Sequence, residues 1–305
     1  MRKVLNLSFA IILFAAVAGA QPPSNSPVPS DSEIRKILVD RIDTFHQGVG
    51  IVVGVIDPQG RRLVAYGSLN QGDLRPLNGE TIFEIGSVTK VFTSLLLSDM
   101  VQRGEVSLAD PVAKYLPADV KVPERNGRVI TLVDLSTHTS GLPRMPSNFN
   151  PKDPANPYAD YTTEQLFQFI SSYKLTRDIG SQFEYSNLGG GLLGQALSRR
   201  AGMDYEALVK SLITVPLGMA STGITLSPEM KARLAVGHDD KLVAVPNWDI
   251  PALAGAGALR STANDLMTFL AANLGYVKSP LAPAMGPTHI SAAKGPPSSS
   301  TPAPR

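Results

Sequence analysis

A serine and a lysine three residues apart are the first candidates for chemistry in this sequence. Ser87 and Lys90 lie in the segment GSVTK, at the point where apolar residues begin to recur at helical spacing. Residues three apart project from the same face of a helix, so the lysine nitrogen can reach the serine hydroxyl. A serine at a helix start also holds developing negative charge near free backbone N–H groups. Alone, the pair arises by chance in most chains of this length, and a capping serine with a solvated lysine is the favoured interpretation.

A second polar group follows 98 residues after the serine. Tyr185 and Asn187 flank Ser186, directly before a glycine-rich helical segment. A tyrosine beside a lysine can have the pKa of its phenol lowered enough to share in proton transfer. The asparagine can present its amide to a bound substrate. Alone, the tripeptide fits a buried tyrosine at a loop–helix junction equally well.

Four segments taken together, in this order, resemble the class C β-lactamase-like serine hydrolases. They are residues 83–90 (FEIGSVTK), 138–143 (HTSGLP), 185–189 (YSNLG) and 254–266 (AGAGALRSTANDL). The family includes β-lactamases, low-molecular-weight penicillin-binding DD-peptidases and serine carboxylesterases. The resemblance covers roughly residues 33–276.

The resemblance implies a role for each candidate residue. Ser87 is expected to be the nucleophile that forms the acyl-enzyme, with its own N–H as one oxyanion donor. Lys90 is expected to activate the serine. Tyr185 is expected to pass a proton to the leaving group and to help activate water, and the division of this work between the two stays open. Asn187 is expected to bind the amide side chain of the substrate. No metal and no cofactor are implied, and His138 is expected to be a buried hydrogen-bonding residue.

The favoured substrate is a β-lactam or a D-Ala-D-Ala-type amide, so the partner is a small molecule or a peptidoglycan peptide. A carboxylesterase with the same serine, lysine and tyrosine is the first alternative, because the motifs fix the nucleophile and not the acyl group. The second alternative is a non-hydrolytic penicillin-binding protein or an inactive remnant. The sequence does not predict the oligomeric state.

The N-terminus and the composition bear on location and partners. Arg2 and Lys3 precede an apolar run that ends in small residues, which predicts a cleaved signal peptide over residues 1–20 and a periplasmic or secreted protein. The run is shorter than the roughly 20 residues of a membrane anchor. The chain has 28 basic and 26 acidic residues, and removal of residues 1–20 leaves it neutral, which argues against nucleic acid or membrane partners. The absence of cysteine excludes disulfides and thiolate chemistry.

The order of the expected elements, a strand pair and then a long helical insertion, predicts an α+β fold. The resemblance implies its β-lactamase/DD-peptidase-like form: an antiparallel sheet flanked by helices, plus a mostly helical domain, with the active-site cleft at their junction. Thr162 with Gln165, and Thr262 with Asp265, each predict a capping box. The expected elements are a helix over 31–45, a hairpin over 49–66, a helix over 87–103, a helical insertion over about 105–235 with helices at about 163–173, 188–201 and 204–213, and a helix over about 262–275.

The two ends of the chain are rich in proline. We expect a linker over residues 21–30, a hydrolase domain over 31–276 and a low-complexity tail over 277–305. A third motif of the family, Lys-Thr-Gly or His-x-Gly on an inner strand, is not found after the 262–275 helix. Residues 293–296 (AKGP) are a poor match. The sheet's C-terminal strands are therefore expected to be missing, and with them the second oxyanion donor.

Overall fold

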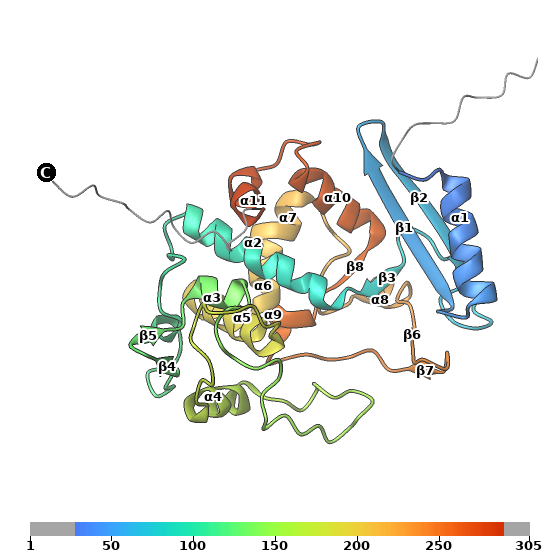
Figure 1. Cartoon of the computed structure of the whole chain (residues 1–305). Helices are drawn as coiled ribbons and strands as arrows, with labels where there is room; N and C mark the ends of the chain where they lie inside the picture. Colours follow the sequence, from blue (N-terminus) through green and yellow to red (C-terminus); the bar gives the residue numbers. More distant parts are fainter. Residues whose placement is uncertain (1–27, 290–305) are drawn as a thin grey trace, which may run out of the picture.

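The computed structural model describes residues 28–289 (Figure 1). The expected signal peptide, most of the expected linker and the AKGP segment lie outside the described residues. Figure 1 shows a hairpin with helix α1 at one edge of the molecule and a larger helical body beside it. No helix within residues 28–289 is both long and apolar enough to cross a bilayer.

The hairpin is built from two eight-residue strands, β1 (Gly50–Asp57) and β2 (Gly60–Gly67). They are antiparallel, with Gly50 opposite Gly67 and Asp57 opposite Gly60. The Asp57 carboxylate closes the turn by accepting the N–H groups of Gln59 and Gly60. Among the described residues, each of these strands pairs only with the other. The hairpin predicted over 49–66 is therefore confirmed.

Helices cover both faces of the hairpin. Helix α1 (Asp31–Val39), which continues as a π-helical turn over Asp40–Thr44, packs on β2 and buries Ile34 and Leu38 against Val64. Helix α10 (Ala263–Asn273) packs on β1 from the other side and connects the hairpin to the helical body (Figure 1). Gly54 makes this approach possible, because a Cβ there would lie 2.8 Å from Met267.

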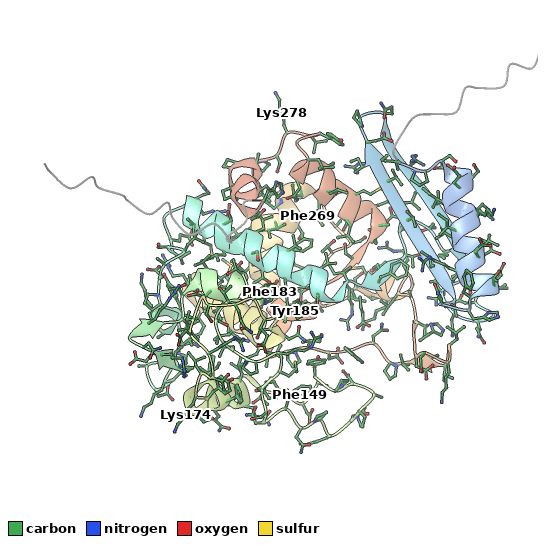
Figure 2. All side chains as sticks on the ribbon, viewed as in Figure 1. Phe149, Lys174, Phe183, Tyr185, Phe269 and Lys278 are labelled. Carbon is green, nitrogen blue, oxygen red and sulfur yellow. The ribbon has the colours of Figure 1, made fainter. Side chains whose placement is uncertain are left out.

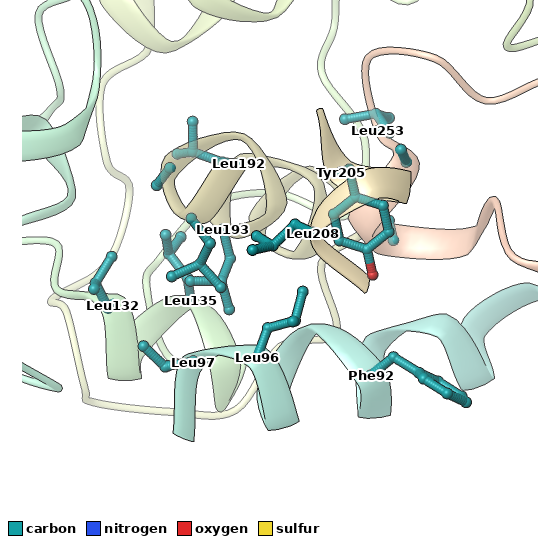
Figure 3. Packing of buried hydrophobic residues seen from close by; sticks show 14 of the residues in the cluster. Phe92, Leu96, Leu97, Leu132, Leu135, Leu192, Leu193, Tyr205, Leu208 and Leu253 are labelled. Atoms are coloured by element: carbon teal, nitrogen blue, oxygen red, sulfur yellow. The ribbon is translucent and has the colours of Figure 1, made fainter. Parts of the chain in front are cut away.

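The main core surrounds helix α2 (Thr89–Gln102). Figure 3 shows its leucines facing side chains of α3 (Leu132–Ser136), α5 (Asn187–Ala201) and α6 (Tyr205–Val209). Leu96, Leu192 and Leu135 are each at most 1% exposed. Burying such a side chain contributes about 1.5–3 kcal/mol, so this cluster holds the helices that carry the polar motifs.

In the expected helical insertion the regular structure is almost all helical, but helices cover fewer than half of its residues, and the region contains one small hairpin that the sequence pattern did not predict. The hairpin pairs β4 (Glu124–Arg125) with β5 (Arg128–Val129). Helix α4 (Thr163–Ser172) begins in the predicted capping box of Thr162 and Gln165. The remaining short elements of the insertion and of the segment that follows it are 3-10 helix η3 (Val112–Tyr115), π-helix η4 (Lys210–Thr214), α7 (Val215–Leu217), α8 (Pro228–Lys231), β6 (Gly237–His238), β7 (Ala244–Val245) and α9 (Ala254–Gly257).

Two short strands that are far apart in sequence pair with each other and lead into helices α2 and α10. Strand β3 (Ile82–Glu84) pairs antiparallel with β8 (Arg260–Thr262). Helix α10 starts directly after β8, capped by the Thr262 hydroxyl. The predicted reciprocal bond, from the Thr262 backbone N–H to the Asp265 carboxylate, is absent, and this carboxylate instead accepts from the Ser221 N–H and the Thr222 hydroxyl. The second capping-box prediction is therefore only half right.

The prediction of a low-complexity tail from residue 277 is wrong for its first part. Residues Ala282–Thr288 form helix α11, which packs against α2. Leu281, Ala284 and Met285 are at most 4% exposed, and the Ser98 hydroxyl donates to the Ala284 carbonyl at 2.6 Å. The spacing of these apolar residues is helical, and the proline in the first turn needs no N–H donor there. The proline count concealed this pattern.

Candidate active site

Ser87 lies in a tight turn between β3 and α2. The turn is a 3-10 helix over Gly86–Val88 (η2), and Gly86 adopts a φ of +48°, which glycine tolerates better than other residues. Lys90 lies three residues later, in the first turn of α2. Its Nζ donates to the Ser87 Oγ at 3.1 Å. The serine is exposed, whereas the lysine is half-buried.

The other two predicted residues meet this pair from the start of α5. Ser186 caps the helix by accepting the Gly189 N–H. Tyr185 lies below α2 in the view of Figure 2 and is half-buried, and its hydroxyl donates to the Ser87 Oγ at 2.5 Å. The Asn187 Oδ1 accepts from the Lys90 Nζ at 2.9 Å. The structure thus brings all four predicted residues into one hydrogen-bonded group.

Glycines in α5 make this closeness possible, a role that sequence reasoning missed. A Cβ on Gly190 would lie 3.1 Å from the Lys90 Cε, and one on Gly191 would lie 2.4 Å from the Leu253 Cδ2. Because α9 can approach α5 at these glycines, the Ala256 carbonyl lies 2.6 Å from the Lys90 Nζ and accepts its third hydrogen bond. A run of three glycines at a helix start was the available signal.

Two groups of the site have lowered pKa values, for different reasons. Burial lowers the pKa of Lys90, and the nearby Arg144 adds to this effect. Burial alone would raise the pKa of Tyr185, but contact with Lys90, the bond to Ser87 and the charge of Arg144 outweigh it, so the phenol pKa is lowered. Among the described residues, no carboxylate pairs with Lys90.

Two protonation states keep all these contacts and place a base beside Ser87, and in each of them the serine hydroxyl donates across one contact that the structure records with the serine as acceptor. A neutral Lys90 donates to Asn187 and Ala256 and accepts the proton of Ser87, while the Tyr185 hydroxyl donates to the serine oxygen. Alternatively, a charged Lys90 donates to all three oxygens and Ser87 donates to a tyrosinate. The two states differ in the position of one proton, so either residue can take the serine proton.

His138 supports the tyrosine segment. Its Nδ1 accepts the Ser186 N–H at 3.2 Å, and its ring centre lies 4.7 Å from that of Tyr185. Burial, and then the charge of Lys90, lower its pKa, which favours the neutral ring that this hydrogen bond needs. It is half-buried and hydrogen-bonded, in line with its expected structural role.

A pocket of about 510 Å³ opens beside the serine. Sequence reasoning assigned only Ser87 and Asn187 among its lining residues; the structure adds, among others, Glu84, Arg144, Tyr158 and Trp248. Tyr158 and Trp248 lie in different loops, and their ring centres are 5.4 Å apart. Beside them, Asn156 and Asp249 exchange two hydrogen bonds of 2.9 Å. Within residues 28–289, no group of three or more His, Cys, Asp or Glu side chains could hold a metal ion.

The family model described as Beta-lactamase matches residues 38–299 of this sequence. The chain belongs to the beta-lactamase family. This chain is 36% identical over 270 residues to the D-alanyl-D-alanine-carboxypeptidase/endopeptidase AmpH of Escherichia coli K12. The matched residues are 87% of this chain and 68% of the relative. A beta-lactamase of Lysobacter lactamgenus is 29% identical over 272 residues, 89% of this chain and 67% of the relative.

Solved structures agree with the family. The beta-lactamase/D-alanine carboxypeptidase of Yersinia pestis, solved with citrate, has a TM-score of 0.71 and 30% identity over 84% of this chain and 74% of its own. A class C beta lactamase of Rhodobacter sphaeroides has a TM-score of 0.71 and 28% identity over 84% and 70% of the two chains. These findings confirm the α+β fold class, the resemblance and a serine hydrolase.

Proposed function

We propose that this chain hydrolyses D-Ala-D-Ala-type peptides and β-lactams through an acyl group on Ser87. One observation carries the proposal: the Ser87 Oγ has two proton-handling partners, the Lys90 Nζ at 3.1 Å and the Tyr185 Oη at 2.5 Å. Both partners have lowered pKa values. A serine needs such a neighbouring base to act as a nucleophile at neutral pH.

In acylation, the Ser87 Oγ attacks the substrate carbonyl carbon, and its proton passes to Lys90 or Tyr185. The carbonyl oxygen becomes an oxyanion beside the Ser87 N–H and the positive end of α2. The C–N bond then breaks, and the same pair returns the proton to the departing nitrogen. The products of this half-reaction are the acyl-serine ester and a free amine, or an opened ring in a β-lactam.

In deacylation, a water molecule takes the position of the amine. The Tyr185–Lys90 pair accepts a proton from this water as its oxygen attacks the ester carbon. Ser87 leaves and recovers its proton from the pair. Asn187, which is held by Lys90, presents its amide nitrogen toward the acyl group's own amide.

The substrate class is supported by the relatives named above, which are a D-alanyl-D-alanine carboxypeptidase/endopeptidase and a beta-lactamase. These substrates lie outside the cytoplasm, which agrees with the signal peptide pattern of residues 1–20. We therefore propose export of the mature chain to the compartment that contains peptidoglycan.

Turnover of matched substrates tests the proposal. We expect release of the terminal alanine from a peptide ending in D-Ala-D-Ala but not from one ending in L-Ala-L-Ala, and opening of a chromogenic cephalosporin. Ser87→Ala should abolish both reactions. Ser147→Ala, which changes an exposed serine of the neighbouring loop, should retain them.

Two results would contradict the proposal. Hydrolysis of p-nitrophenyl esters without either amide reaction would identify a carboxylesterase. A stable penicillin adduct without turnover would identify a non-hydrolytic penicillin-binding protein.

A further inference from the structure

The catalytic pocket contains a guanidinium group that the proposed reaction does not use. Arg144 lines the pocket with Ser87 and Asn187, and it is exposed. Its Cζ lies 5.1 Å from the centre of the Tyr185 ring. Within residues 28–289, no carboxylate pairs with this guanidinium and none of its N–H groups donates a hydrogen bond. Its donors therefore remain available to a ligand.

The backbone fixes Arg144 next to the residue expected to bind the substrate amide. The Arg144 carbonyl accepts the N–H groups of Asn187 at 3.0 Å and Leu188 at 3.2 Å. The preceding carbonyl, of Pro143, accepts the Ser186 hydroxyl at 2.6 Å. The backbone of Arg144 is thus anchored at the start of α5, and its guanidinium lies over the ring of Tyr185, two residues before Asn187.

The charges around the pocket favour an anionic ligand. Among the residues that line it, Glu84 is the only acidic one. The Glu84 carboxylate already accepts the backbone N–H of Trp248 at 2.7 Å and forms an ion pair with the Arg260 guanidinium at 3.5 Å. Arg144 lines the pocket and has no carboxylate partner among the described residues. An unpaired cation in the wall of a pocket attracts anions and raises their local concentration.

We propose that Arg144 determines specificity by binding a carboxylate on the acyl portion of the substrate. This inference rests on the proposed function, because the acyl portion is the part that remains on Ser87 after the amine leaves. A guanidinium presents a planar fork of donors that matches a carboxylate, which a neutral side chain at this position would lack. Its contact with the Tyr185 ring restricts the orientation of the fork.

Two penicillins that differ by one carboxylate provide the test. Carbenicillin carries a carboxylate on its acyl side chain, and benzylpenicillin is the same molecule without it. Binding is measured in a Ser87→Ala background, where no acyl-enzyme forms. Trp248 lines the pocket and is the only tryptophan in the sequence, so its fluorescence reports occupancy.

The variants compared are Arg144→Met and Lys152→Met, each in the Ser87→Ala background. Lys152 is an exposed cation on the same loop that does not line the pocket, so it controls for the general loss of positive charge. We expect Arg144→Met to weaken carbenicillin binding about tenfold relative to benzylpenicillin, the size typical of a hydrogen bond to a charged group. Lys152→Met should change this ratio less than twofold.

The outcomes separate this inference from the proposed function. An equal effect of Arg144→Met on both penicillins, or an equal change of the ratio by Lys152→Met, overturns the role of Arg144. If the chain with Ser87 intact turns over neither penicillin while the binding ratio still depends on Arg144, the proposed function fails and the anion site stands. If neither compound binds, both are overturned.

Discussion

Replacing Tyr185 with phenylalanine removes one oxygen atom from the centre of the proposed active site. The lost hydroxyl donates to the Ser87 Oγ at 2.5 Å. The ring keeps its contacts, with His138 and Lys90 each 4.7 Å and Arg144 5.1 Å from it. We therefore expect stability to fall by only about 1 kcal/mol, the typical net contribution of one hydrogen bond.

The effect of Tyr185→Phe on rate should be much larger. General acid–base catalysis contributes about 10²–10⁴-fold, which corresponds to about 3–5 kcal/mol of transition-state stabilisation. The assay is kcat/KM for a chromogenic cephalosporin, with the melting temperature measured on the same preparation. A loss below tenfold with unchanged melting would refute the role of the phenol.

The residual activity of Tyr185→Phe should also show which way Lys90 responds. The phenol raises the pKa of Lys90, whereas burial lowers it. Without the phenol the pKa of Lys90 falls further, so the neutral amine predominates from a lower pH. The acidic limb of kcat/KM should therefore move to lower pH. A limb that moves to higher pH would contradict a catalytic role for the neutral amine.

Three further predictions follow from the packing and charge of the site. Arg144→Met should move the acidic limb of kcat/KM to higher pH, because the positive charge of Arg144 lowers the pKa values of both Lys90 and Tyr185 and its removal lets them rise. An unmoved limb in a pH–rate profile would count against this. Gly191→Ala should destabilise the fold by about 1–3 kcal/mol in chemical denaturation, because its Cβ would lie 2.4 Å from the Leu253 Cδ2. The control Gly286→Ala has open space at its Cβ and should leave stability unchanged. Equal effects of the two substitutions would refute this packing argument. Met285→Ala should lower the free energy of unfolding by about 2–5 kcal/mol in chemical denaturation, because the Met285 side chain is buried in the core. A change below about 0.5 kcal/mol would show that residues 277–305 are an unpacked tail, as the sequence predicted.

The sequence predicted the elements whose signal is local. The 49–66 hairpin follows from a turn that Asp57 closes with its own side chain, and α4 follows from a complete capping box. The grouping of Ser87, Lys90, Tyr185 and Asn187 was anticipated because each lies within a recognisable motif. Local side-chain chemistry is sufficient for such features.

Features that depend on distant partners were not predictable. Asp265 occupies a capping-box position, yet residues 221 and 222 compete for its carboxylate. Helix α11 contains prolines and gains its burial from α2 and α10, which lie far from it in sequence or carry no pattern that predicts the contact. Trp248 is held at the pocket by its backbone N–H, which donates to the carboxylate of Glu84, 164 residues earlier in the sequence. No pattern within one segment carries such information.

The central claim is that Ser87 carries the acyl group during turnover. Acid quenching of the chain during reaction with a penicillin, followed by digestion and tandem mass spectrometry, locates that group directly. We predict one penicilloyl adduct per chain on the peptide that contains Ser87, present in Ser147→Ala and absent in Ser87→Ala. An adduct on any other residue, or an unchanged adduct in Ser87→Ala, would contradict the account.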